Sequence, residues 1–118
     1  MRTWMKTGIE MVPSMSEILR KSSKIMSAWI LIHEQWRSID LKTKNDVMIF
    51  SKWCNRQGGD VTNAVRCAFI EHLVEDNDNW SIFRNHYSYD DIMNLMPLWE
   101  YNHENEARSF ALKLAGRI

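Results

Sequence analysis

Long apolar segments are missing from this sequence. The longest uninterrupted apolar run, residues 28–32, falls far short of the ~20 residues that a membrane-spanning helix needs. Arg2 and Lys6 make a basic start, but the apolar core of an export signal does not follow them. We therefore expect a soluble, cytoplasmic protein with no membrane partner.

Cysteine is scarce as well, and only Cys54 and Cys67 are present. Both lie among apolar neighbours in separate predicted helices, where a free cysteine behaves as a small apolar side chain. A disulfide would require an oxidising compartment, for which the chain carries no export signal. We expect two buried, free thiols.

Signatures of metal sites and catalytic sites are also lacking. No two histidines have the i, i+4 spacing of a helical metal site, and the zinc-protease pattern that starts at His33 has Arg37 in place of its second histidine. Residues 76–79 resemble the start of a calcium loop, but Ser81 and Tyr87 occupy the positions of its glycine and its bidentate acid. There is no nucleophile elbow and no glycine-rich phosphate loop. We predict a protein that is not an enzyme and binds neither a metal nor a cofactor.

Alternating apolar and polar residues, the pattern of a half-buried strand, do not extend far enough anywhere to predict one. Apolar residues instead recur at helical spacing behind capping signals at Ser14, Thr43, Asp60 and Ser88. The expected helices cover about residues 14–36, 43–57, 60–75, 80–87 and 88–99, and a last helix runs from Asn102 or Glu104 to Gly116. Pro97 should kink or shorten the fifth helix.

These patterns predict an all-α fold, as a single compact domain of five or six helices over residues 14–118. A bundle and a short stack of helical hairpins both fit the helix lengths. Residues 1–13 lack clear periodicity, and we interpret them as a loose arm or a short lead-in.

Charge is distributed unevenly along the chain. Residues 1–59 carry ten Lys/Arg and five Asp/Glu, whereas residues 60–118 carry five Lys/Arg and ten Asp/Glu, so a neutral total hides two halves of opposite sign. Between Glu71 and Glu106 there are nine acids and one base, Arg84. A surface of this kind could receive a basic partner.

Aromatic residues are interleaved with these acids, as in a docking surface where acids speed encounter and aromatic side chains are buried by the partner. The alternative interpretation places the aromatic side chains in the core and leaves the acids to keep the surface soluble. The candidate partner-binding residues are Glu71, Glu75, Asp76, Asp78, Tyr87, Tyr89, Asp90, Asp91 and Tyr101. The expected partner is a basic protein, bound by a monomer or a homodimer.

Nucleic-acid binding is the alternative function. Arg20, Lys21 and Lys24 lie close together in the first predicted helix and could neutralise phosphates. The helix predicted over residues 60–75 is mostly apolar and ends in acids, so it has little to offer base edges. A hydrolase with dispersed catalytic residues is a third alternative.

Four short patterns lie within residues 43–101. They are Asp46-Val47-x-x-Phe50, the segment 63–73, a helix led by Trp80, and the segment 95–99. In this order they resemble small, all-helical bacterial domains of unknown function and the immunity proteins encoded beside polymorphic or contact-dependent toxins. The resemblance implies a cytoplasmic inhibitor that binds a cognate toxin domain and blocks its active site. Many such toxins are nucleases with basic clefts, which an acidic surface would complement.

Overall fold

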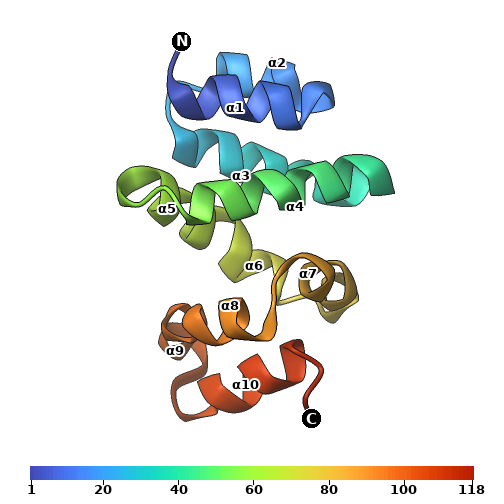
Figure 1. Cartoon of the computed structure of the whole chain (residues 1–118), viewed down its shortest axis with the longest axis vertical. Helices are drawn as coiled ribbons and strands as arrows, with labels where there is room; N and C mark the ends of the chain where they lie inside the picture. Colours follow the sequence, from blue (N-terminus) through green and yellow to red (C-terminus); the bar gives the residue numbers. More distant parts are fainter. The chain divides into compact units, whose positions relative to one another are not determined.

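All regular elements of the described part of the chain are helical in the computed structural model (Figure 1). Side chains are described for residues 1–100 and 105–118. The all-α prediction is confirmed, but the expected number of helices is too low because some predicted helices are interrupted. The elements are α1 (Thr3–Met11), η1 (Pro13–Met15), α2 (Ser16–Lys21), α3 (Ile25–Gln35), η2 (Trp36–Ser38), α4 (Leu41–Asn55), α5 (Gly59–Val65), η3 (Arg66–Ile70), α6 (Glu71–Leu73), η4 (Asn77–Asn79), α7 (Trp80–His86), α8 (Tyr89–Asn94), α9 (Met96–His103), η5 (Glu104–Glu106) and α10 (Ala107–Leu114).

The chain divides into two compact units, Met1–Ile70 and Glu71–Ile118, called here the N-terminal unit and the C-terminal unit. Each unit has buried aromatic side chains of its own. The single domain predicted over residues 14–118 stays a prediction.

Aromatic rings hold the N-terminal unit together. Trp29 on α3 lies between Phe50 on α4 and Phe69 on η3, with ring centroids 5.2 and 4.7 Å away. All three side chains are fully buried. Helix α3 packs against α5 and η3, and α4 packs against α1 and α5. Since side chains of this size bury large apolar areas, this cluster contributes substantially to the stability of the unit.

Residues 3–11 form helix α1, where the sequence suggested a loose arm or a short lead-in. Trp4 and Gly8 are buried on its inner face. Gly8 lets α1 approach closely, because a Cβ at this position would lie 2.8 Å from Cζ of Phe50. The periodicity was hard to recognise because one of the two inner positions is a glycine, which carries no apolar side chain.

The helix predicted over residues 14–36 is broken into α2 and α3 by Ser22, Ser23 and Lys24. Ser22 is buried, and its Oγ donates a hydrogen bond of 2.7 Å to the carbonyl oxygen of Ile18. Serine favours helix ends because its hydroxyl competes for backbone groups in this way. The predicted cap at Ser14 is also wrong, since its hydroxyl lies 3.2 Å from that of Thr43.

The N-terminal cap of helix α4 lies three residues earlier than predicted. Its cap is Asp40, whose Oδ1 accepts a 2.8 Å hydrogen bond from the backbone N–H of Thr43, the residue predicted to be the cap. The helix ends ahead of Gly58 and Gly59, as expected, and both glycines have positive φ. The next helix starts at Gly59, one residue before the predicted cap, Asp60.

The helix predicted over residues 60–75 is helical from Gly59 to Leu73, with a π-helical turn, η3, in its middle. The turn rotates the residues after it, because each of its hydrogen bonds spans five residues. Phe69 and Ile70 are fully buried, whereas Cys67 is exposed. The prediction of two buried thiols is therefore correct for Cys54 and wrong for Cys67.

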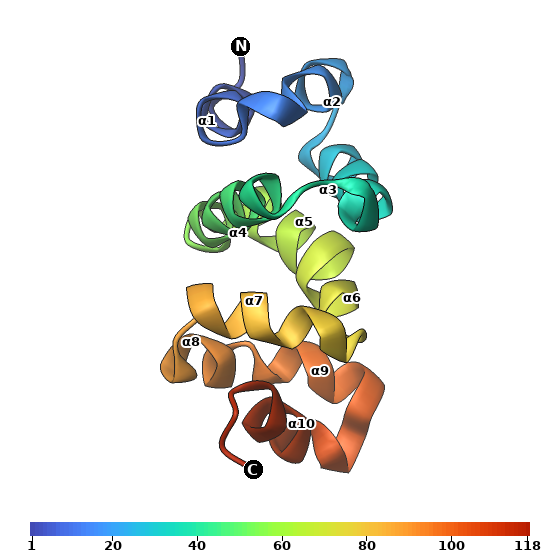
Figure 2. The same cartoon turned by 90° about the vertical axis from the view of Figure 1, so that its right-hand side faces the viewer.

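In the C-terminal unit, α8 and α9 pack against α10 (Figure 2). Ser88 and Asp91 form the predicted capping box, each side chain accepting a backbone N–H of the other residue at 3.1 Å. The fifth predicted helix is divided at Leu95 into α8 and α9, and Pro97 lies in the first turn of α9, where its missing N–H costs little. Gly116, with φ of 76°, follows α10 as expected.

Candidate protein-binding surface

The charge asymmetry of the sequence coincides with the two structural units. The N-terminal unit carries eleven Lys/Arg and six Asp/Glu, whereas the C-terminal unit carries four Lys/Arg and nine Asp/Glu. Each unit therefore has a net formal charge of five, positive in the first and negative in the second. The candidate acidic residues all belong to the C-terminal unit.

The first acidic group precedes α7 and contains Glu71, Glu75, Asp76 and Asp78. Glu75 and Asp78 are exposed, while Glu71 and Asp76 are partly buried. Asp76 has a structural role, since its Oδ1 accepts a 3.0 Å hydrogen bond from the backbone N–H of Asp78 and caps η4. Oε1 of Glu75 lies 3.5 Å from Nδ1 of His72. The carboxylate of Asp78 makes no ion pair or hydrogen bond with any described residue.

The second acidic group, Asp90 and Asp91, lies in the first turn of α8. Asp91 is partly buried and is committed to the capping box. Asp90 is exposed, and its carboxylate makes no ion pair or hydrogen bond with the residues that the structure describes. Asp90 is thus available to a partner, whereas Asp91 contributes first to the stability of α8.

Of the three predicted surface tyrosines, Tyr89 is 37% exposed, and the guanidinium of Arg117 lies 4.9 Å from the centre of its ring. The prediction for Tyr87 is wrong: this side chain is 2% exposed and stacks on Phe83 with ring centroids 4.3 Å apart. Stacking on a buried ring holds Tyr87 in the core. Tyr101 lies outside the described residues.

The two acidic groups flank the ends of α7, which has seven residues and is therefore about 10 Å long. A partly exposed aromatic side chain accompanies each group. Trp80 begins α7 next to the first group, and its Nε1 donates a 2.7 Å hydrogen bond to the carbonyl oxygen of Val74. Tyr89 is adjacent to Asp90 in the second group. We give the name acidic surface to the exposed residues Glu75, Asp78, Tyr89 and Asp90 together with the partly exposed Trp80.

A hollow of about 300 Å³ beside Trp80 was not predicted from the sequence. Glu106, Ser109, Phe110 and Lys113 line its other side, and the ring centroid of Phe110 lies 5.8 Å from that of Trp80. Ser109, Phe110 and Lys113 lie on one face of α10, and Glu106 is the N-cap of that helix. Their spacing of three and four residues is a signal that the sequence carries. The pairing of that face with Trp80 depends on tertiary packing, which no local pattern reveals.

The alternative basic cluster is also accessible. Arg20 and Lys21 end α2, and Lys24 precedes α3; all three side chains are exposed. They belong to the unit of net positive charge. Their positions therefore agree with contact to an anionic partner, although they lie at the junction of two helices and not along one long helix.

Across residues 1–100 and 105–118, no three His, Cys, Asp or Glu side chains are grouped so that they could hold a metal ion. None of the described helices combines the length and the apolar character required to cross a bilayer.

Compared with known proteins, the chain matches no family model, no curated protein and no solved structure.

Proposed function

We propose that the protein binds a basic protein through the acidic surface and, as an immunity-type inhibitor, occludes a toxin domain such as a nuclease. The observation that carries the proposal is the pair of unpartnered carboxylates, Asp78 and Asp90, each next to a partly exposed aromatic side chain in a unit of negative charge. The resemblance to immunity proteins points in the same direction.

The charges would act mainly on the rate of association. Like charges summed over one unit attract an oppositely charged partner from a distance and raise the rate of encounter, an effect that salt reduces. Trp80 and Tyr89 would supply the contacts that slow dissociation, because large aromatic side chains are frequent hot spots of interfaces. The two groups belong to one unit and are separated in the chain by the short helix α7, about 10 Å long, so a partner of standard interface size can reach both.

The experiment is affinity capture from lysate of the native host with three forms of the whole chain. The forms are the parent, Asp78→Lys/Asp90→Lys, and the control Glu10→Lys/Glu34→Lys. The control changes the net charge equally but alters two exposed acids of the N-terminal unit. We expect the parent and the control to retain the same basic protein after nuclease treatment, and the Asp78/Asp90 variant to lose it at moderate salt.

The captured protein is then purified and its association rate measured at low salt. We expect the Asp78/Asp90 variant to associate about tenfold more slowly than the parent and the control. Addition of the parent should also abolish the partner's catalytic or toxic activity. Equal association rates for all three forms would refute the acidic surface, and a bound partner that keeps its activity would refute inhibition.

Nucleic-acid binding remains the second candidate, favoured by the exposure of Arg20, Lys21 and Lys24. It predicts that the chain binds DNA or RNA with an affinity that falls steeply with salt, because phosphate contacts release counterions. Arg20→Ala/Lys21→Ala should then weaken binding and reduce the salt dependence. Binding that survives this change at every salt concentration would exclude the cluster as the contact.

A further inference from the structure

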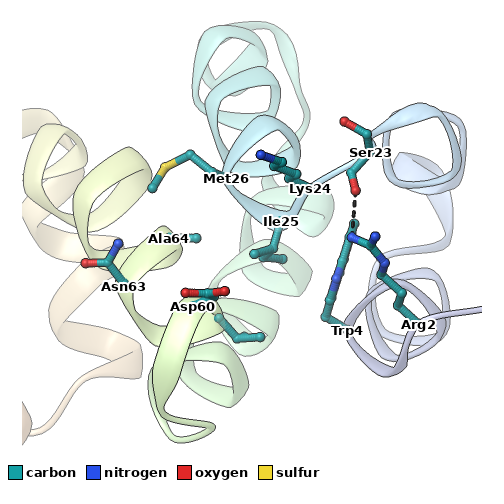
Figure 3. A pocket seen from close by; sticks show the side chains of 10 residues that line it. Arg2, Trp4, Ser23, Lys24, Ile25, Met26, Asp60, Asn63 and Ala64 are labelled. Carbon is teal, nitrogen blue, oxygen red and sulfur yellow. Dashed lines mark hydrogen bonds between the residues drawn. The ribbon is translucent and has the colours of Figure 1, made fainter.

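A pocket of about 630 Å³ lies within the N-terminal unit (Figure 3), and none of the residues of the acidic surface lines it. Three segments that are distant in the sequence form its walls: the start of α1, the turn into α3, and the first turns of α5. The volume is within the range of about 300–1,000 Å³ that is usual for small-molecule sites. Nothing in the proposed protein-binding function uses this pocket.

The apolar residues that line the pocket are Trp4, Ile25, Met26, Val61 and Ala64. Trp4 is 7% exposed, Ile25 6% and Ala64 1%, so these side chains are held in place by the core of the unit. A fixed wall that includes an indole ring suits a flat, apolar group. Binding there would remove apolar surface of the ligand from water.

The charged part consists of Arg2, Lys24 and Asp60, two positive groups against one negative group. Nη1 of Arg2 donates a 2.7 Å hydrogen bond to the carbonyl oxygen of Ser23, which fixes the guanidinium beside the pocket. A guanidinium has five N–H donors, and this bond uses one of them. Neither Lys24 nor Asp60 makes an ion pair or a hydrogen bond with the described residues through its side chain.

We propose that this pocket binds a small amphipathic anion, with a flat apolar body against Trp4 and an acidic group at Arg2 and Lys24. The net charge of the lining selects an anion over a neutral or cationic molecule of the same shape. Arg2 supplies directed donors in a fixed position, whereas Lys24 supplies a mobile charge. Asp60 lies on α5, and its carboxylate opposes any second negative group on the ligand.

The test compares two fluorescent probes of similar shape on the whole chain. The anion is 8-anilinonaphthalene-1-sulfonate, and the neutral control is N-phenyl-1-naphthylamine. Both are titrated against the parent, Lys24→Gln, Asp60→Asn and Lys21→Gln. The last variant removes the same charge as Lys24→Gln from an exposed residue that does not line the pocket. Circular dichroism of each variant verifies that it is folded, because the anion also binds to partly unfolded proteins.

We expect the parent to bind the anion more tightly than the neutral probe. Lys24→Gln should weaken the affinity for the anionic probe about three- to tenfold, which is the effect of one charge at contact distance in a partly hydrated site. Asp60→Asn should raise the affinity for the anionic probe by a similar factor, and Lys21→Gln should change that affinity less than about twofold. None of these variants should alter the affinity of the neutral probe.

A blocking variant locates the probes. Asn63 is exposed and lines the pocket, so Asn63→Trp narrows the site without disturbing the core. We expect it to reduce the affinity of both probes. Equal affinities for the two probes, a folded Lys24→Gln that binds the anion as well as the parent does, or an Asn63→Trp variant that retains both probes would each overturn the proposal.

Discussion

Replacement of Gly8 by alanine should destabilise the N-terminal unit, although alanine is the better helix former. The added Cβ would lie 2.8 Å from Cζ of Phe50 and 3.0 Å from Cδ1 of Leu19, both closer than the 3.5–4.0 Å of a favourable carbon–carbon contact. Phe50 is fully buried and is stacked between Trp29 and Trp53, at 5.2 and 6.1 Å. The ring therefore has little room to move away from the new methyl group.

Two opposing terms set the size of the effect. Gly→Ala in the middle of a helix contributes about 1 kcal/mol of stability, whereas an extra methyl group in a packed core costs about 1–3 kcal/mol. Since the two nearest groups are both in the core, we place the cost at the middle of that range. The expected net loss in the free energy of unfolding is about 1 kcal/mol, or a Tm lower by about 4 °C.

The assay should report on the N-terminal unit alone, and the reactivity of the Cys54 thiol provides such a signal. This thiol is fully buried, so a maleimide or disulfide reagent modifies it only when the unit opens. Under native conditions its modification rate follows the free energy of opening. Gly8→Ala should raise that rate about fivefold, the equivalent of about 1 kcal/mol. A urea titration monitored by tryptophan fluorescence gives an independent value.

A second variant identifies the contact. In a Phe50→Leu background the ring atoms nearest to Gly8 are absent, so Gly8→Ala should cost less there than in the parent. A Gly8→Ala protein as stable as the parent, or an alanine that costs the same with and without the Phe50 ring, would refute the close approach of α1 and α4.

Three further results are expected. Burial raises the pKa of the Cys54 thiol to about 12, so Ellman's reagent at neutral pH should modify only Cys67 in the folded chain and both thiols in urea. Rapid modification of both thiols in the folded chain would contradict this prediction. Ser88→Ala should lower the free energy of unfolding, measured in urea, by about 1 kcal/mol, as the loss of a helix cap usually does. A loss of less than a few tenths of a kcal/mol would show that the capping box contributes little to stability. Hydrogen bonds from Thr43 lower the pKa of Asp40, so the ionised Asp40 carboxylate stabilises the folded chain fully above its ordinary pKa of about 4, and this stabilisation is lost as pH falls through the lowered pKa. Asp40→Asn should therefore make the free energy of unfolding depend less on pH in this acidic range, and an unchanged pH dependence would refute the role of Asp40.

Local signals were sufficient for much of the fold. The capping box at Ser88 needs only a serine and an acid three residues later, so it was predictable. The glycines at 58 and 59 were recognisable for the same reason, because positive φ is a property of the residue itself. Thr43 was predicted as a cap and Asp40 was not, although both residue types cap helices and the two are only three positions apart.

Tertiary contacts explain the remaining differences. Ile18, Ser22, Ile25 and Trp29 are all buried at helical spacing, so the periodicity continues through a break in the helix. The pattern of buried residues alone did not reveal that the Ser22 hydroxyl donates a hydrogen bond to the carbonyl oxygen of Ile18, at the point where the helix ends.

The candidate sites depended still more on packing. The exposure of Asp78 and Asp90 agrees with a sequence rich in acids, but the burial of Tyr87 depends on Phe83. The pocket between α1, α3 and α5 joins residues up to 62 positions apart, from Arg2 to Ala64, and no local pattern marks it. Sequence periodicity predicts which residues are inside, whereas hollows arise from what the core leaves unfilled.

The division of charge between the two units has a consequence for handling the protein in solution. The sequence pI of about 6.9 means that molecules near neutral pH have no net charge to keep them apart, yet each still carries a positive and a negative unit. Opposite units of different molecules then attract one another at low ionic strength, and dissolved salt screens that attraction. The protein should therefore become more soluble as moderate salt is added, and concentrated stocks should be kept away from pH 7 or in salted buffer.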